Sequence, residues 1–282
     1  MEDALRAEYL REGLSSGVIR SFRRFLLRFY EREGRDLPWR RTTDPYPVLV
    51  SEFMLQQTQV ERVLAKYPVF LEAFPDVRAL AEAPRQKVLL AWQGLGYNRR
   101  ALALHATARI ITGEFGGEIP LDRATLLSFP GIGSSTAVAV VVFSANRPGI
   151  FIETNIRRVY LHLFFPDDER VHDREIEPIL EKTLDRKNPR RFYYALMDFG
   201  SFLKKGAGNP NLRSASYARQ GRFEGSDRQV RGFILRHLLK CGEVGEKELR
   251  DVTGVDTTRF DRILAGLERD GFLYRDRGRI WC

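Results

Sequence analysis

The sequence predicts an all-α protein of two helical subdomains, followed by a small winged-helix-like domain at the C-terminal end. Before residue 270, hardly any segment alternates apolar and polar residues with a period of two, which argues against a central sheet. Apolar residues instead recur at helical spacing, as Val18, Phe22 and Phe25 do. The chain ends with three helical segments and a short hairpin around Arg277, an order typical of a winged helix.

Composition and charge narrow the class of protein. The chain has 282 residues, 43% hydrophobic and 29% charged, which is enough for packed cores. No apolar run approaches the ~20 residues needed to cross a bilayer, and the charged start lacks the apolar core of a secretory signal. The net charge of +9 favours nucleic acid as partner over a membrane surface, with a plain basic protein as the alternative. We expect a cytoplasmic monomer, nucleoid-associated if prokaryotic.

Helices are expected to follow one another through the first 203 residues. The first clear one covers 16–32, and a structured loop with three prolines then covers 35–48. Ser51 is expected to cap the next helix, at 59–74. The remaining helical segments are 77–83, 86–92, 98–111, 124–129, 134–144, 155–165, 174–186 and 190–205.

A change in composition marks the domain boundaries. Segment 204–226 is rich in Gly, Ser, Asn and Arg, and it is interpreted as a basic loop or linker. We therefore expect a helical domain at 1–203, with its two subdomains, and a winged-helix-like domain at 227–282. In the latter, Asp276, Arg277 and Gly278 form the predicted hairpin turn.

A tight turn between two apolar helices is the first motif that points to a function. Pro130 ends one helix, Gly131 and Gly133 permit a close turn, and the next helix starts at Ser134 or Ser135. The N–H groups at such a helix start form a seat for a phosphate. A plain helix–helix turn is the alternative. The apolar helices on both sides favour a helix-hairpin-helix motif, which binds duplex backbone without reading sequence.

Glu153 is a lone carboxylate between an apolar run and a segment predicted to be helical. A charge beside so much apolar surface is costly unless it is paired, capped or used. The residue is open to three interpretations: a helix-start carboxylate near Arg157, half of an ion pair, or a catalytic group.

Five motifs together carry a family resemblance. RDLPWR, SEFMLQQTQV, GLGYNRRA, LSFPGIGSSTA and ALMDFG occur in this order, and together they resemble the A/G-specific adenine DNA glycosylases of the helix-hairpin-helix superfamily. The resemblance covers about residues 30–200. It implies two helical subdomains with a base pocket between them. It also implies excision of a mispaired or damaged base from duplex DNA, with adenine opposite guanine or 8-oxoguanine as the leading substrate.

The resemblance assigns roles position by position. Glu52 matches the general acid that protonates the adenine, and Glu153 stands where relatives carry the catalytic aspartate, supported by Asn155. Ser135 stands where bifunctional relatives carry a Schiff-base lysine, so monofunctional, hydrolytic base removal is expected. The resemblance places in the base pocket Arg35, Trp39, Arg40 and Asp198. It assigns to DNA binding Gln56, Gln57 (a wedge in the base stack), Thr58, Tyr97 (an aromatic contact), Gly131, Ile132, Gly133, Ser134 and Thr136.

Three features depart from that family. Its members usually hold an iron–sulfur cluster, whose cysteine positions correspond here to Lys204, Asn211, Ser214 and Gln220. Since the chain has only Cys241 and Cys282, we expect no cluster, no metal and no other cofactor. The family's 8-oxoguanine-recognition domain has no counterpart. Glu replaces Asp at position 153, which extends that side chain by one methylene.

Simpler interpretations compete with these roles. Glu52 could be an acid near a helix start that interacts with the dipole, and Trp39 and Tyr97 could be core aromatics. Asp198 could merely pair with an arginine. The winged-helix-like unit either binds DNA backbone through its Arg-rich hairpin or contacts protein. For the whole chain, the alternatives are a thymine or uracil mismatch glycosylase and a structure-specific DNA-binding protein with an inactive pocket.

Overall fold

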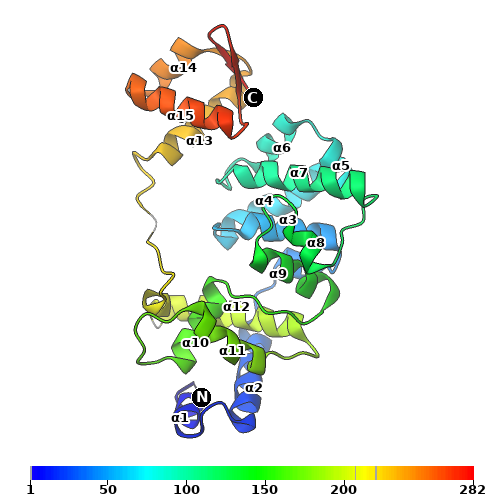
Figure 1. Ribbon diagram of the computed structural model, residues 1–282, viewed down its shortest axis with the longest axis vertical. Helices are drawn as coiled ribbons and strands as arrows, with labels where there is room; N and C mark the ends of the chain where they lie inside the picture. Colours follow the sequence, from blue (N-terminus) through cyan, green and yellow to red (C-terminus); the bar gives the residue numbers. More distant parts are fainter. Residues whose placement is uncertain (1, 207, 220) are drawn as a thin grey trace. The chain divides into compact units, whose positions relative to one another are not determined.

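The computed structural model describes residues 2–206, 208–219 and 221–282. The chain divides into two compact units, one built from Met1–Glu52 and Ile119–Ala218, the other from Phe53–Glu118 and Arg219–Cys282. Helices dominate both, and a small sheet lies near the C-terminal end (Figure 1). The predicted fold class is therefore confirmed. None of the described helices has the length and apolar character needed to span a membrane.

The first unit contains most of the helices that the sequence predicts. Its helical elements are α1 (Glu2–Glu12), α2 (Ser16–Glu33), η1 (Pro38–Arg40), α3 (Pro45–Leu55, which continues into the second unit), α8 (Arg123–Leu127), α9 (Ser134–Ala145), α10 (Thr154–Phe164), α11 (Asp173–Thr183), α12 (Pro189–Gly206) and η2 (Pro210–Arg213).

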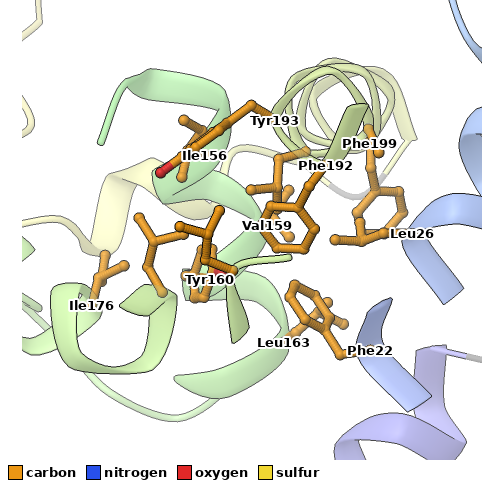
Figure 2. Close-up of a cluster of buried hydrophobic side chains, with 14 of the residues drawn as sticks. Phe22, Leu26, Ile156, Val159, Tyr160, Leu163, Ile176, Phe192, Tyr193 and Phe199 are labelled. Carbon is orange, nitrogen blue, oxygen red and sulfur yellow. The ribbon is translucent and has the colours of Figure 1, made fainter. Parts of the chain in front are cut away.

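An aromatic core fixes the helices of this unit. Side chains from α2, α10, α11 and α12 point toward one another in Figure 2, where Phe22 and Tyr160 are among those labelled. The ring centroids of Phe22 and Phe164 are 5.1 Å apart in an edge-to-face pair, a favoured geometry for aromatic rings. The Tyr160 hydroxyl lies 2.6 Å from the Thr183 hydroxyl, so this buried polar group is satisfied.

Gly200 lets α12 lie close against the start of α10. A Cβ atom added to Gly200 would lie 2.2 Å from the Asn155 carbonyl oxygen. That separation is shorter than any van der Waals contact, so only glycine permits this approach. The N-terminal turn of α10 is thereby held directly against the middle of α12.

The second unit combines a helical part with the C-terminal domain. It contains α4 (Val60–Ala73), α5 (Val77–Glu82), α6 (Arg85–Trp92), α7 (Arg99–Glu114), α13 (Asp227–Cys241), β1 (Val244–Gly245), α14 (Glu246–Thr253), α15 (Thr257–Arg269), β2 (Tyr274–Asp276) and β3 (Arg279–Trp281). The strands form one antiparallel sheet in the order β1-β3-β2.

The C-terminal domain has the winged-helix order expected from the sequence. Ser226 and Asp256 cap α13 and α15 by accepting hydrogen bonds from the backbone N–H groups of Gln229 and Arg259. In the hairpin between β2 and β3, Arg277 and Gly278 have φ of 46° and 76°, and a two-residue hairpin turn needs positive φ at both positions. The two-residue strand β1 was not expected.

The sequence prediction was wrong between residues 45 and 59. Ser51 does not cap a helix: it lies inside α3, where its hydroxyl donates to the Val48 carbonyl oxygen at 2.8 Å. The helix α3 begins at Pro45, because proline is tolerated in the first turn, where its missing N–H would have no helical partner. The following helix, α4, has Gln59 as its N-cap.

Part of segment 204–226 is folded rather than extended. Asn211 is buried, and its side chain donates to the Thr154 carbonyl oxygen at 2.9 Å. Arg213 donates to the Leu161 and Pro166 carbonyl oxygens at 2.8 and 2.7 Å, at the C-terminal end of α10 and just beyond it. These bonds tie η2 to both ends of α10.

Replacing Gly200 by alanine is expected to destabilise the protein. The added methyl group must displace the Asn155 backbone, and such overpacking typically lowers the free energy of unfolding by ~1–3 kcal/mol. Thermal unfolding followed by circular dichroism measures the effect. The control is Gly113→Ala in α7, where an added Cβ meets no atom within 4 Å and helix propensity favours alanine. Equal melting temperatures for wild type and Gly200→Ala would contradict the close-packing argument.

Candidate active site

Glu52 lies in the last turn of α3 and is half-buried. Burial, with a smaller contribution from the charge of Glu153, raises the pKa of Glu52 to about 8. Its carboxyl group is therefore mostly protonated at neutral pH. The helix-start interpretation of Glu52 was wrong, because the residue lies at the C-terminal end of its helix, where the dipole also disfavours a negative charge.

Glu153 is the N-cap of α10. Its Oε1 accepts hydrogen bonds from the backbone N–H groups of Asn155 and Ile156 at 2.9 and 3.0 Å. Its Oε2 accepts from Asn155 Nδ2 at 3.3 Å. The carboxylate is thus held by three donors at the positive end of a helix, which answers the question of how a charge is tolerated here.

The supporting residues lie on α10 and α12. Asn155 Oδ1 accepts from Arg158 Nη1 at 2.8 Å, and the same Nη1 donates to the Gly200 carbonyl oxygen at 2.6 Å. Arg157 instead forms a bidentate pair with Asp173, through contacts of 2.6 Å. The ion-pair interpretation of Glu153 with Arg157 is therefore not the arrangement found, although both arginines lie near enough to influence the pKa of Glu153.

The two carboxyl groups of Glu52 and Glu153 form one electrostatic site. Burial raises the pKa of Glu153, and this effect outweighs its hydrogen bonds and the two nearby arginine charges. A negative charge on one carboxyl group makes ionisation of the other less favourable. The pair therefore favours the state in which one carboxyl group is protonated and the other is ionised. No group among the described residues donates a hydrogen bond to the Glu52 carboxyl group. Glu52 is therefore the better proton carrier. Glu153, with three donors, is the better anion.

The helix-hairpin-helix turn lies between α8 and α9. Gly131 has φ of 76°, a conformation that favours glycine, while Ile132 is buried and anchors the turn from inside. Gly133 and Ser134 are exposed at the start of α9. Next to them, the Ser135 hydroxyl donates to the Ile152 carbonyl oxygen at 3.3 Å, so this side chain lies beside the residue that precedes Glu153.

Asp198 is the centre of a buried ion-pair network. It accepts from Arg35 Nε at 2.7 Å, from Arg40 Nη1 and Nη2 at 2.8 Å each, and from the Arg35 backbone N–H at 2.8 Å. Its side chain is 1% exposed and that of Arg40 is 6% exposed. Trp39 is also buried. Trp39 is therefore a core aromatic residue and Asp198 pairs with arginines, as the simpler interpretations expected. Arg35, whose side chain is 32% exposed, is the member of this set that reaches the surface.

Residues assigned to duplex opening lie together in the second unit. Gln57 is exposed with φ of 53°, and Tyr97 is 40% exposed with φ of 47°. Thr58, beside Gln57, has its hydroxyl 3.4 Å from the Leu95 carbonyl oxygen, two residues before Tyr97. The loops 56–58 and 95–97 therefore contact each other, and Gln56 in the first of them is half-buried.

The residues present do not fit an iron–sulfur cluster. A cluster of the family type takes four thiolate ligands, and the chain has two cysteines. Four positions correspond to the family's cluster cysteines. Asn211 and Ser214 are buried and form hydrogen bonds, and Lys204 is near the end of α12. Gln220 lies outside the described residues. Within the described ranges, no group of three or more His, Cys, Asp or Glu side chains is placed to hold a metal ion.

Two residues near the carboxyl pair were not predicted. Tyr194 is buried, and its pKa is raised mainly by burial, with opposing influences from Arg40 and Glu52, which lie nearby. The Arg40 guanidinium lies over the Tyr194 ring, 4.5 Å from its centroid. Arg158 is nearly fully buried. A sequence signal existed only for Arg158, an arginine at helical spacing after Asn155.

Replacing Asp198 by asparagine is expected to destabilise the protein strongly. Removing one partner of a buried ion pair leaves the arginine charges uncompensated, which typically costs about 3–5 kcal/mol. Burial alone would raise the pKa of Asp198, but Arg40 and Arg35 lower it below the ordinary carboxyl value. At pH values above that ordinary value, the ionised network therefore stabilises the fold. That stability is lost as the pH falls through the lowered pKa.

Denaturant unfolding of wild type and Asp198→Asn at neutral and acidic pH measures both effects. The control is Asp36→Asn, since Asp36 pairs with Arg41 on the surface and is expected to contribute little. A difference between wild type and Asp198→Asn that stays the same from neutral to strongly acidic pH would contradict the role given to the ionised carboxylate.

Comparisons with known proteins identify the family to which the chain is related. Residues 50–186 match the family model described as HhH-GPD superfamily base excision DNA repair protein. An adenine DNA glycosylase of Mycobacterium tuberculosis is 36% identical over 277 residues, covering 89% of each chain. One of Mycolicibacterium smegmatis is 35% identical over 267 residues, covering 88% of this chain and 91% of the relative.

Solved structures show the same fold. A thermostable thymine-DNA glycosylase has a TM-score of 0.58 at 26% identity, covering 65% of this chain and 86% of the other. A trapped covalent endonuclease III–DNA intermediate has a TM-score of 0.57 at 21% identity, covering 67% and 87%. The identity of 35–36% to adenine DNA glycosylases over most of both chains shows that the chain belongs to the adenine DNA glycosylase family.

Proposed function

We propose that the chain is a monofunctional DNA glycosylase that removes adenine opposite guanine or 8-oxoguanine from duplex DNA by hydrolysis. Membership of the family makes it an N-glycosyl hydrolase of base-excision repair. The observation that carries the proposal is the pair of Glu52 and Glu153, two half-buried carboxyl groups with unequal environments. Such a pair separates an acid from an anion, as glycoside cleavage requires.

Each residue of the pair takes one role in the reaction. Glu52, whose pKa is raised to about 8, protonates the leaving adenine and so weakens the N-glycosidic bond. Glu153, held by Asn155 and the α10 N-terminus, places its negative charge beside the sugar as that sugar becomes cationic. Water then adds to the sugar and gives up a proton to the Glu52 carboxylate, which restores the acid form of Glu52. Ser135 has a hydroxyl in place of an amine, so no Schiff base forms at that position and strand cleavage is not part of the reaction.

The DNA must first present the base outside the stack. In this proposal, Gly131, Gly133 and Ser134 bind backbone phosphate at the α9 start. Gln57 enters the base stack as a wedge, and Tyr97 supports the opened duplex by stacking. Arg35 lines the base pocket, while Arg40, Trp39 and Asp198 form its rigid wall from within the core.

A specific observation favours one second candidate. The likeness to a thymine-DNA glycosylase is at 26% identity, so excision of thymine, or of uracil, from a mispair with guanine is the alternative activity. A structure-specific DNA-binding protein without chemistry is the alternative from another class.

A panel of duplexes tests the function directly. Purified protein is incubated in excess with duplexes carrying adenine, thymine, uracil or hypoxanthine opposite guanine or 8-oxoguanine, and the released base is identified by mass spectrometry. We expect adenine release by wild type, with no release by Glu52→Gln or Glu153→Gln and unchanged binding of duplex by Glu52→Gln. Release of thymine alone would support the second candidate, and release of no base would contradict the enzyme proposal.

The pH dependence of base release tests the roles of the two carboxyl groups. Glu52 acts in its protonated form, so the single-turnover rate should be level near neutral pH and fall about tenfold per unit above a pH of about 8. Glu153 acts as an anion, and its pKa is raised. On the acid side of the profile, the rate should therefore begin to fall at a higher pH than it would with a glutamate of ordinary pKa. A rate that stays constant from neutral to strongly alkaline pH would exclude Glu52 as the acid.

A further inference from the structure

Arg100 is a buried charge with an unusual position. It lies in the first turn of α7, where the positive end of the helix dipole disfavours a cation. Among the described residues, no carboxylate pairs with it, and burial lowers its pKa to about 10. Its guanidinium lies over the Trp92 ring, 5.4 Å from the centroid. A buried charge in an unfavourable place needs many compensating contacts.

Those contacts begin at the C-terminal end of α3. Arg100 Nη1 donates to the carbonyl oxygens of Phe53 and Met54 at 2.8 and 2.9 Å, and to that of Gln56. The last carbonyl groups of a helix have no partner within the helix, and they carry its partial negative charge. Arg100 thereby closes the end of α3 and fixes the residue that precedes Gln57.

Its other nitrogen atoms bind groups of both loops. Arg100 Nη2 donates to Thr58 Oγ1 at 2.8 Å and to the Gly96 carbonyl oxygen at 3.0 Å. The Leu95 carbonyl oxygen lies 3.3 Å from the same atom, and the Tyr97 carbonyl oxygen lies 3.4 Å from Nε. One guanidinium therefore joins loops 56–58 and 95–97.

The bound groups bracket two residues in a strained conformation. Gln57 and Tyr97 have φ of 53° and 47°, in the left-handed region that is unfavourable for a non-glycine residue. Arg100 binds Gln56 and Thr58 on either side of Gln57, and it binds Gly96 and the carbonyl group of Tyr97 itself. Strained residues persist where neighbouring contacts over-determine them, and they cluster at functional sites.

We propose that Arg100 is a positioning residue for duplex opening: it holds the Gln57 and Tyr97 loops in the one arrangement that lets Gln57 enter the base stack while Tyr97 stacks against the opened duplex. The inference rests on the proposed function, which gives Gln57 and Tyr97 their roles. Arg100 itself is 9% exposed, and its donors are directed at protein carbonyl and hydroxyl oxygens, so its proposed role is to hold the loops. Lysine cannot replace it, because an ammonium group has three donors at one point, whereas a guanidinium has five in a planar fork.

The experiment compares a closed substrate with one already open. Arg100→Met and Arg100→Lys are assayed by single-turnover base release from a mispaired duplex and from a duplex with the target base in a three-nucleotide bubble. Arg109→Met, at an exposed position of the same helix, is the control. We expect a loss on the order of 100-fold on the closed duplex for both Arg100 variants, as for a small misplacement of working groups. On the bubble they should release base nearly as fast as wild type.

Two further measurements separate positioning from stability. A 2-aminopurine next to the target base reports unstacking by its fluorescence, and Arg100→Lys should lose that signal at a temperature where circular dichroism shows it folded. Adding Gln57→Ala to Arg100→Lys should slow the closed-duplex reaction no further, because both changes remove the same step.

The outcomes distinguish this inference from the proposed function. Equal losses on closed and bubble substrates, or additive effects of Gln57→Ala and Arg100→Lys, would overturn the role of Arg100. Wild type that unstacks the 2-aminopurine but releases no base would contradict the proposed function, and the fluorescence of the Arg100 variants would then still decide their role. If Arg100→Met does not fold, Arg100→Lys carries the test.

Discussion

The burial of two carboxyl groups, to which the charge of Glu153 adds a smaller effect on Glu52, is the constraint on which the site depends. Neither Glu52 nor Glu153 is ionised as easily as in water, and the first to lose its proton makes the second loss harder. The surroundings decide which one becomes the anion. Three hydrogen-bond donors at the α10 N-terminus select Glu153. The scaffold therefore assigns acid and anion before any substrate is bound.

Helix α12 makes that assignment rigid. Through Gly200 it contacts the first turn of α10, and through the Gly200 carbonyl oxygen it orients Arg158, which in turn holds Asn155. Two residues earlier on the same helix, Asp198 fixes Arg35 and Arg40. A single helix thus positions both the residues that hold Glu153 and the two arginines that bind Asp198, so a shift of α12 would disturb both groups.

Local sequence patterns predicted most of the helices outside segment 45–59, but they did not predict which residues distant in the sequence pair with one another. The apolar stripe of α2 and the Gly278 turn are visible in adjacent residues, so their structures follow from local rules. Asp198 meets arginines far away in the sequence, and nothing near it reveals which interpretation holds. Arg100 has carbonyl oxygens as partners, and a sequence does not display those. Its one local sign was a cation in the first turn of a helix.

The cap geometry also explains why glutamate can stand at position 153. A longer side chain would place a free carboxylate at an uncertain distance from its target. Here Oε1 is held by two backbone N–H groups and Oε2 by the Asn155 side chain, so the α10 N-terminus determines where the charge lies. Because Gly200 and Arg158 fix Asn155, the position of the charge depends more on helix packing than on side-chain length.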